Sequence, residues 1–303
     1  MSFRSKLRPL KGAAARLLER IWRSGFGTAA RFTRSNAKRW SSAGEQSVLV
    51  VAPHPDDEAM GCVGTVLLHV QSGDRVCIAT VTDGRLSRVI ADAAEMARRR
   101  RLEAIEAARL MGVQRHEWMG LPEGNWSVSG LKDSLRALIE ATQPDLIYAP
   151  SRIDFHPEHW RAAHALALAI AASTTVCDRG LRVRVYQIQV PLNPLMVNLV
   201  ADVSALHSQC DSVFRAYASQ AGSIECTHRH RRYNAAWHCI AGQAEEFWEL
   251  SARQYVSLHA EPPAGWPNAF RGLRGFPLTD PLAYLVGMRE RRRLSKSLLR
   301  PSA

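Results

Sequence analysis

The sequence lacks any apolar run approaching the roughly 20 residues that a helix needs to cross a bilayer. Near its first residues it also lacks the uninterrupted apolar region of a secretory signal peptide. Its six cysteines are scattered without CxxC spacing, which favours reduced, buried cysteines in a cytoplasmic protein. Neither a serine nor a cysteine stands in a setting typical of a catalytic nucleophile, so a covalent mechanism is disfavoured.

Acidic residues are scarce at the two ends of the chain. Residues 1–40 carry a net charge of +10 and residues 289–303 carry +5, whereas residues 41–288 carry −3. The +12 of the whole chain therefore belongs to its ends. A nucleic-acid-binding domain needs a basic surface across its folded body, so this distribution argues against a nucleic-acid partner.

Residues 1–45 form a basic segment in which apolar residues such as Leu7, Leu10 and Ile21 recur at helical spacing. This pattern is typical of an amphipathic helix on an anionic membrane surface, which would place the protein peripherally at the inner face of the membrane. It also resembles an Arg-rich transit peptide, and a disordered basic tail is the third interpretation. In each case the segment is an appendage to the folded body.

From Ser47 onward, strand patterns alternate with helical patterns. The predicted strands are 48–52, 75–81, 116–119 and 145–149, and the helices predicted to follow them are 57–71, 91–111, 131–142 and 157–173. Such alternation implies right-handed crossovers between parallel strands. The predicted fold class is therefore α/β, with a mainly parallel sheet and helices on both faces, over residues 46–260.

The later part of the chain continues with strands and then helices. The predicted strands are 182–190 and 196–200, and the predicted helices are 204–221 and 235–256. Between these helices, the HRHRR run at 228–232 indicates a solvated connection, with a second metal site or a phosphate site as the alternative. Residues 261–303 are predicted to form an irregular basic extension.

Two polar motifs follow predicted strands directly: VLVVAPHPDDE (48–58) and SRIDFHPEHWR (151–161). Each contains a His-Pro pair followed by acids and a helical pattern. Proline is favoured at the first position of a helix, and acids are favoured in its first turn. A spacing of three residues places His54 near Asp57, and His156 near His159. Because ligands bind beyond the carboxyl ends of parallel strands, we expect the two motifs to lie close together.

Two imidazoles and one carboxylate form a common catalytic zinc shell. His54, Asp57 and His159 are the predicted ligands of Zn²⁺, or of another divalent metal such as Fe²⁺ or Co²⁺. Asp56 is the predicted general base for metal-activated water, and His156 is predicted to stabilise the oxyanion and protonate the leaving nitrogen. The predicted reaction is hydrolysis of an amide or ester. The simpler alternative is that each motif only caps a helix.

The run APHPDDE resembles the first signature of the PIG-L (LmbE-like) family of zinc-dependent N-acetylglucosaminyl deacetylases. HPEH resembles the second signature, usually HPDH, with Glu158 in place of the aspartate. Further similarity at residues 100–113 and 120–124, and a weaker one at YASQ and QAEEF, extends the resemblance over about residues 47–257. It implies a Rossmann-like α/β fold, hydrolysis of an N-acetyl group on an amino sugar, and the same ligands, base and histidine as above.

Three loop residues are the predicted substrate contacts: Arg85, Glu123 and Asn125, with solvated loop positions as the alternative. The sequence as a whole predicts a zinc-dependent N-deacetylase acting on an amino sugar or an N-acetylglucosamine-containing glycoconjugate. A lipid-linked glycan is the natural substrate if residues 1–45 bind a membrane. Two other functions stay open: deacetylation of a small glycoside or glycopeptide, and non-catalytic sugar binding.

Overall fold

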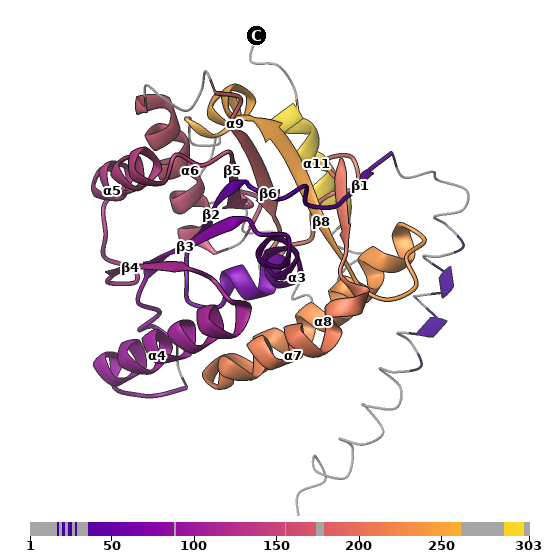
Figure 1. Ribbon diagram of the computed structural model, residues 1–303, viewed down its shortest axis with the longest axis horizontal. Coiled ribbons are helices and arrows are strands. Elements are labelled where there is room, and N and C mark those ends of the chain that lie inside the picture. Colours follow the sequence, from indigo (N-terminus) through magenta and orange to yellow (C-terminus); the bar gives the residue numbers. More distant parts are fainter. Residues whose placement is uncertain are drawn as a thin grey trace, which may run out of the picture.

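The computed structural model describes residues 36–87, 89–154, 156–173, 179–261 and 288–299, together with residues 17, 20, 21, 24, 25 and 28. Within this part of the chain, eight strands form one sheet in the order β1-β7-β8-β6-β5-β2-β3-β4 (Figure 1). The strands are β1 (Lys38–Trp40), β2 (Ser47–Ala52), β3 (Arg75–Thr82), β4 (Arg115–Leu121), β5 (Leu146–Pro150), β6 (Arg182–Tyr186), β7 (Leu199–Asp202) and β8 (Ala244–Ser251).

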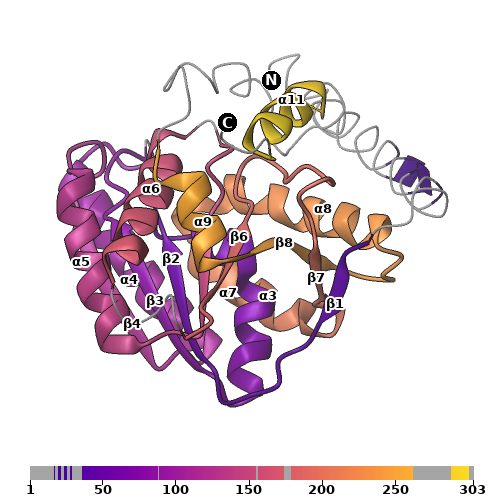
Figure 2. The same cartoon turned by 90° about the horizontal axis from the view of Figure 1, so that it is seen from above.

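Helices cover both faces of the sheet (Figures 1 and 2). The described helices are α3 (Asp57–Gln71), α4 (Ala93–Met111), α5 (Val128–Thr142), α6 (Pro157–Ala172), α7 (His207–Ala216), α8 (Ala221–Trp237), α9 (Ala252–His259) and α11 (Met288–Leu299). Helices α5, α6 and α9 lie on one face, and α3, α4 and α7 lie on the other. The predicted α/β class, with its mainly parallel sheet, is confirmed.

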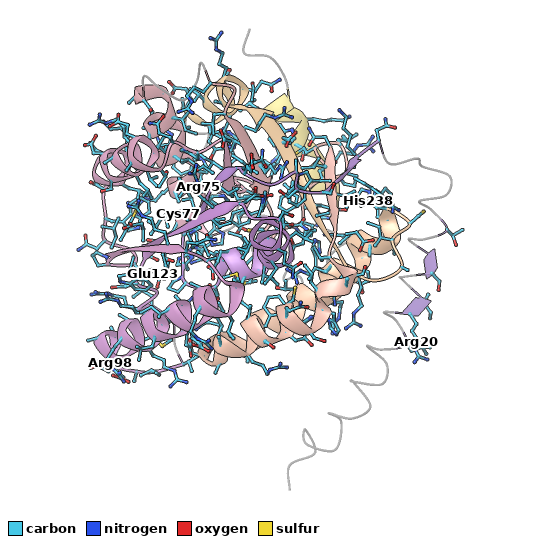
Figure 3. All side chains as sticks on the ribbon, in the orientation of Figure 1. Arg20, Arg75, Cys77, Arg98, Glu123 and His238 are labelled. Carbon is cyan, nitrogen blue, oxygen red and sulfur yellow. The ribbon has the colours of Figure 1, made fainter. Side chains whose placement is uncertain are left out.

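Strand β2 shows why the centre of the sheet forms. All six of its residues are buried, and successive side chains point to opposite faces. Leu49 therefore packs in the core under α5 and α6, whereas Val50 packs in the core under α3 and α7. Charged side chains such as Arg98 of α4 project outward from the helices (Figure 3). A strand buried on both faces needs a continuous apolar run, which is the pattern that the sequence shows.

The predicted helix over 235–256 is wrong, because residues 244–251 form strand β8. This strand runs antiparallel between β6 and β7. The acids of β8 concealed the strand pattern, because acidic residues are normally exposed. Here Glu245 is buried and accepts hydrogen bonds from the backbone N–H groups of Gly64 and Thr65 at 2.9 and 2.8 Å. Residues 243–247 (QAEEF) therefore belong mostly to a strand and not to a helix.

The predicted solvated connection at 228–232 is also wrong. These residues lie inside α8, where His230 and Arg231 are buried. Arg231 pairs with Glu245 of β8, so the buried cation and the buried anion neutralise each other. The basic run thus includes residues that join α8 to the sheet.

The two ends of the folded region differ from the predicted boundaries. Strand β1 lies within the predicted appendage 1–45, yet it pairs parallel with β7 at the edge of the sheet. Helix α11 lies within the predicted irregular extension, and its Leu294 belongs to the core under α5, α6 and α9. Most of residues 1–35, on which the amphipathic-helix prediction depends, lie outside the described residues. Among the described helices, none combines the length and apolar character needed to cross a bilayer.

Candidate active site

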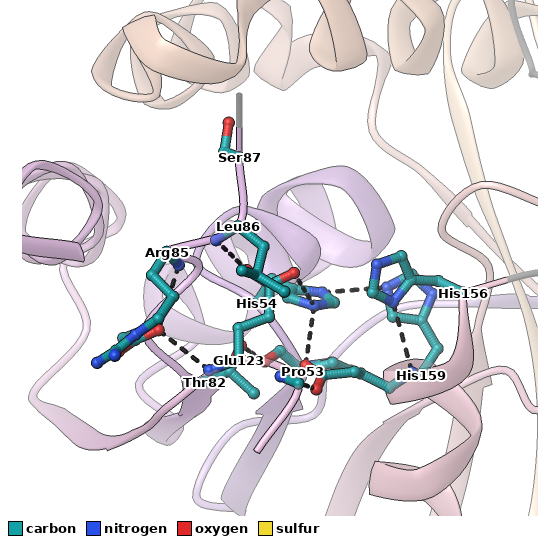
Figure 4. Close-up of polar contacts among 12 residues, drawn as sticks. Pro53, His54, Thr82, Arg85, Leu86, Ser87, Glu123, His156 and His159 are labelled. Atoms are coloured by element: carbon teal, nitrogen blue, oxygen red, sulfur yellow. Dashed lines mark hydrogen bonds and ion pairs between the residues drawn. The ribbon is translucent and has the colours of Figure 1, made fainter. Parts of the chain in front are cut away.

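The loops after β2 and β5 bring the two predicted motifs together. His54 follows β2, and α3 begins at Asp57. His156 is the N-cap of α6, with Pro157 at the first helical position, as the sequence predicts. Strands β2 and β5 are neighbours in the sheet and parallel, so both loops emerge at the same edge. In Figure 4 the rings of His54, His156 and His159 lie beside one another.

Three donor atoms converge at this edge: His54 Nδ1, Asp57 Oδ2 and His159 Nε2. The carboxylate oxygen lies 3.0 Å from the His54 nitrogen and 3.4 Å from the His159 nitrogen, and the two nitrogens are 3.3 Å apart. Bonds of about 2.0–2.2 Å to a tetrahedral metal place its ligands about 3.3–3.5 Å from one another. The spacing of these atoms therefore fits a metal held by the three residues that the sequence predicts.

Each of the two imidazoles meets a second carboxylate at its other ring nitrogen. His54 Nε2 lies 3.2 Å from Glu158 Oε2, and His159 Nδ1 lies 3.2 Å from Asp154 Oδ2. A carboxylate in this position fixes the orientation and tautomer of a metal-binding histidine. The other oxygen of Glu158 accepts hydrogen bonds from Gly124 N–H and Trp126 Nε1–H, at 2.7 and 2.8 Å. Glu158 thereby ties the loop after β4 to the histidine cluster.

The charges of this cluster also suit a cation. Burial alone lowers the pKa of His54, but the hydrogen bond and charge of Asp57 outweigh burial and raise it to about 9. Burial likewise disfavours the charged form of His159. The anions Asp57 and Asp154 outweigh this effect and raise the pKa of His159 well above its usual value. Burial raises the pKa of Asp57, yet the two histidines hold it well below its usual range. The cluster thus attracts positive charge, which protons supply when no metal is bound.

Asp56 stands next to the predicted ligand Asp57, but its side chain contacts a different partner. Its Oδ1 accepts a hydrogen bond from Arg100 Nη2 of α4 at 2.8 Å, and both side chains are buried. The backbone of Asp56 has φ 129, a conformation that non-glycine residues rarely adopt. Such a conformation costs about 1–3 kcal/mol and is found mainly at functional sites. It directs the two consecutive carboxylates to different partners, Asp56 to Arg100 and Asp57 to the two histidines.

The environment of Asp56 tunes its proton affinity. Burial raises its pKa, the guanidinium of Arg100 opposes that effect, and the net value is about 6. Its backbone N–H donates to Glu58 Oε2 at 3.3 Å, and Glu58 accepts a hydrogen bond from the hydroxyl of Tyr217. A carboxylate with a pKa near the working pH is well matched to proton transfer.

His156 lies above the cluster without joining it by a hydrogen bond. Its Nδ1 accepts from the backbone N–H of Glu158 at 3.4 Å, so the proton of the neutral ring is on Nε2. Burial, and next the charges of His54 and His159, lower its pKa to about 2. His156 is therefore a neutral imidazole whose Nε2–H is able to donate a hydrogen bond.

A cavity of about 200 Å³ opens over these groups. Glu123 lines it, with Oε1 3.6 Å from His54 Nε2 and Oε2 accepting from Leu86 N–H at 2.8 Å. Arg85 does not line it: its guanidinium is paired with Asp83 and points away from the histidines (Figure 4). Asn125 is exposed and also stands outside the lining. Of the three predicted substrate contacts, the structure places only Glu123 in the cavity.

Sequence reasoning missed several groups of this site. Arg100 stands in a run of four arginines that looks uniformly solvated, and only the fold shows that this one turns inward. Asp154 precedes the HPEH motif by two residues, so an acid at that spacing was the available signal. The cavity wall also includes Ser87, Gln189 and Gln220, which no motif distinguishes.

Comparison with known proteins identifies the region that carries these residues. Residues 49–171 match the family model described as PIG-L, GlcNAc-PI de-N-acetylase. This part of the chain is similar to a PIG-L domain. The matched range includes all five residues predicted to bind metal or to act in catalysis.

Named relatives of the PIG-L domain are deacetylases. The chain is 32% identical to "1D-myo-inositol 2-acetamido-2-deoxy-alpha-D-glucopyranoside deacetylase 2" of Saccharopolyspora erythraea over 40% of this chain and 55% of that protein. It is 27% identical to "Probable N-acetyl-alpha-D-glucosaminyl L-malate deacetylase 2" of Bacillus cereus over 67% of this chain and 97% of that protein. The chain therefore spans only about half of the first relative.

A solved structure shares the fold. The N,N'-diacetylchitobiose deacetylase of Pyrococcus horikoshii superposes with a TM-score of 0.59 at 24% identity, over 70% of this chain and 86% of that one. This agreement extends beyond residue 171, so the fold similarity covers more of the chain than the family model does.

Proposed function

We propose that this protein is a metal-dependent hydrolase that removes an N-acetyl group from an amino sugar or from an N-acetylglucosamine-containing glycoconjugate. The convergence of His54 Nδ1, Asp57 Oδ2 and His159 Nε2 within 3.4 Å of one another, with Asp56 beside them, carries this proposal. The relatives support the substrate class, since both are named as deacetylases of glucosamine derivatives.

These three residues would hold the metal. Nitrogen and oxygen donors suit zinc, and Fe²⁺ and Co²⁺ fit the same donor set. Bound there, a divalent metal would polarise the acetamide carbonyl and lower the pKa of water to about 7. Glu158 and Asp154 would keep the two ligand imidazoles oriented, because each lies 3.2 Å from the second ring nitrogen.

Asp56 would act as the general base. It lines the cavity, and its contact with Arg100 leaves one carboxylate oxygen to accept the proton of the attacking water. With a pKa of about 6, the carboxylate is ionised at neutral pH. The acid formed on Asp56 then delivers the proton to the leaving amine nitrogen, which returns the base to its starting state.

His156 would stabilise the charge that develops on the carbonyl oxygen. A neutral imidazole with its proton on Nε2 is a hydrogen-bond donor, and it faces the cavity from the α6 side. Its lowered pKa makes it a poor source of a proton for the leaving nitrogen. We therefore retain the predicted oxyanion role and assign the proton delivery to Asp56.

The sugar would occupy the rest of the cavity. Glu123, Ser87, Gln189 and Gln220 supply carboxylate, hydroxyl and amide groups there, which suit the hydroxyl groups of a sugar ring. A non-catalytic sugar-binding protein would need such groups but not a buried base next to a metal shell. The described site thus favours an enzyme over a binding module. Membrane contact through residues 1–45 stays a prediction.

Acetate release tests this function. The metal-loaded full chain is incubated with a panel of N-acetylglucosamine derivatives that differ in the group at the anomeric carbon, including inositol, malate, lipid-linked and peptide-linked forms. We expect acetate and free amine in equal amounts from at least one member, and none after chelation of the metal. A fully metal-loaded protein that releases acetate from no member would contradict the proposal.

A further inference from the structure

A second cluster of metal-ligating side chains lies outside the catalytic cavity, between α7 and α8. His207 and Asp211 stand one helical turn apart on α7, and His228 comes from α8. Asp211 Oδ2 lies 3.6 Å from His207 Nε2, and Asp211 Oδ1 lies 3.5 Å from His228 Nε2. One donor atom from each residue falls within 4.8 Å of the other two. Two imidazoles therefore face the two oxygens of one carboxylate.

These groups face one another without hydrogen bonds between them. Within the described part of the chain, the buried atoms Asp211 Oδ1 and His228 Nδ1 have no hydrogen-bond partner. Buried polar atoms normally find partners, because an unsatisfied atom has lost its hydrogen bonds to water without replacing them. A cation between the carboxylate and the imidazoles would satisfy Asp211 directly. The arrangement thus fits a bound cation better than a closed hydrogen-bond network.

Neighbouring side chains hold the two imidazoles in place. The ring of Phe214 packs edge-on against His228, with centroids 4.7 Å apart. The amide of Gln243 lies 2.9 Å from His207 Nδ1, and its Oε1 has no partner among the described residues. The nitrogen and oxygen of such an amide exchange places by a simple flip. With the oxygen facing the ring, Gln243 accepts a hydrogen bond from Nδ1–H of His207, and the Nε2 lone pair is left for a metal.

The local charges permit metal binding at neutral pH. Burial lowers the pKa of His228, which favours the neutral form of the ring that a metal needs. Two cations, Arg231 and Arg232, act on His228, and Arg231 is paired with Glu245. Asp211 supplies the negative charge of the cluster, and His207 is largely exposed, which gives an ion a path from solvent.

We propose that His207, Asp211 and His228 form a second, structural site for a divalent transition metal of the zinc type. Two imidazoles and one carboxylate favour zinc, nickel, copper or cobalt over magnesium and calcium, which prefer oxygen ligands. Water would complete the coordination on the exposed side of His207. This site is independent of the proposed deacetylase function and shares no residue with the catalytic cluster.

The site would join α7 to α8 on either side of the segment 217–220. That segment reaches the catalytic region, because Tyr217 donates to Glu58 and Gln220 lines the cavity. Gln220 Nε2 also donates to Ser87 Oγ at 3.0 Å, across the cavity wall. Metal bound between the helices would therefore stabilise one wall of the substrate cavity.

Metal stoichiometry tests this site on the full-length protein. Wild type, His228→Gln, His207→Gln and the catalytic-cluster variant His159→Gln are stripped of metal, dialysed against micromolar ZnCl₂ and assayed by mass spectrometry. We expect about two zinc ions per chain in wild type and about one in each single variant. His116→Gln is the matched control, since His116 is half-buried on β4 outside both clusters, and it should bind as wild type does.

Thermal unfolding gives a second readout. Zinc should raise the unfolding temperature of His159→Gln, in which only the second site remains, and the increase should disappear in His159→Gln/His207→Gln. Because His207 is exposed, this second substitution should leave the fold intact. A wild type that binds only about one zinc ion would overturn the proposal, as would a His207→Gln or His228→Gln variant that keeps two. Binding that appears only at millimolar zinc would also overturn it.

Discussion

Arg100 Nη2 lies 2.8 Å from Asp56 Oδ1, although 44 positions separate the two residues in the sequence. The guanidinium also donates to the backbone carbonyl of Pro55, so Arg100 holds both the side chain and the preceding peptide of the proposed base. The contact opposes the effect of burial on the pKa of Asp56. Through Arg100, helix α4 thus contacts the proposed base in the loop after β2.

The ionisation of Asp56 should set the acid limit of activity. The base works only when deprotonated, so kcat/KM should fall as the pH drops through its pKa, which is about 6 without metal. A neighbouring bound cation lowers that pKa, so the acid limb should lie at or below about pH 6. A pH profile of kcat/KM measures it. An activity that does not fall between pH 7 and pH 4, in a protein that stays folded, would contradict the role of Asp56.

Removal of the Arg100 charge should shift the acid limb of the pH profile of kcat/KM. In Arg100→Gln the charge that lowers the pKa of Asp56 is absent, so the acid limb should shift to higher pH and kcat should fall. Arg100→Lys keeps the charge and should retain the wild-type limb. The comparison of the two pH profiles separates an electrostatic role from simple packing. If the acid limb falls at the same pH in both variants, the charge of Arg100 does not set the pKa of Asp56.

Metal binding should release protons. Without metal, the raised pKa values of His54 and His159 keep both rings protonated at pH 7.5, whereas a metal requires both to be neutral. We therefore expect release of about two protons per metal ion at the catalytic cluster. Calorimetric titration of His207→Gln in buffers of different ionisation enthalpy isolates this value. No dependence of the measured heat on the buffer would disprove the predicted protonation of the cluster.

The buried ion pair between Arg231 and Glu245 should matter for stability. Glu245 also accepts from two backbone N–H groups of α3, so its removal leaves a buried cation and unpaired donors. Glu245→Ala should lower the free energy of unfolding by about 3–5 kcal/mol in urea denaturation. The matched control Glu106→Ala breaks an exposed pair with Arg109 and should cause a much smaller loss, because solvent screens exposed ion pairs. Similar losses in both variants would contradict this account.

The same residues show what the sequence could and could not predict. Both His-Pro motifs follow strands buried on two faces, so their convergence was predictable from the rules of parallel sheets. Strand β8 was not, because Glu245 and Glu246 look like surface residues of a helix until their buried partners are known. Arg100 was hidden for the same reason, among three other arginines. Arg85 followed a strand end as Glu123 did, but its pairing with Asp83 takes it away from the cavity.

Asp56 is the proposed base, and His54, Asp57 and His159 are the proposed metal ligands. Both roles are tested by measuring metal content and acetate release on the same samples of wild type, Asp56→Ala and His159→Ala. We expect Asp56→Ala to keep the catalytic metal but to lose turnover by at least about 100-fold, and His159→Ala to lose both. An Asp56→Ala variant with near wild-type turnover, or a His159→Ala variant that keeps both metal and turnover, would contradict these roles.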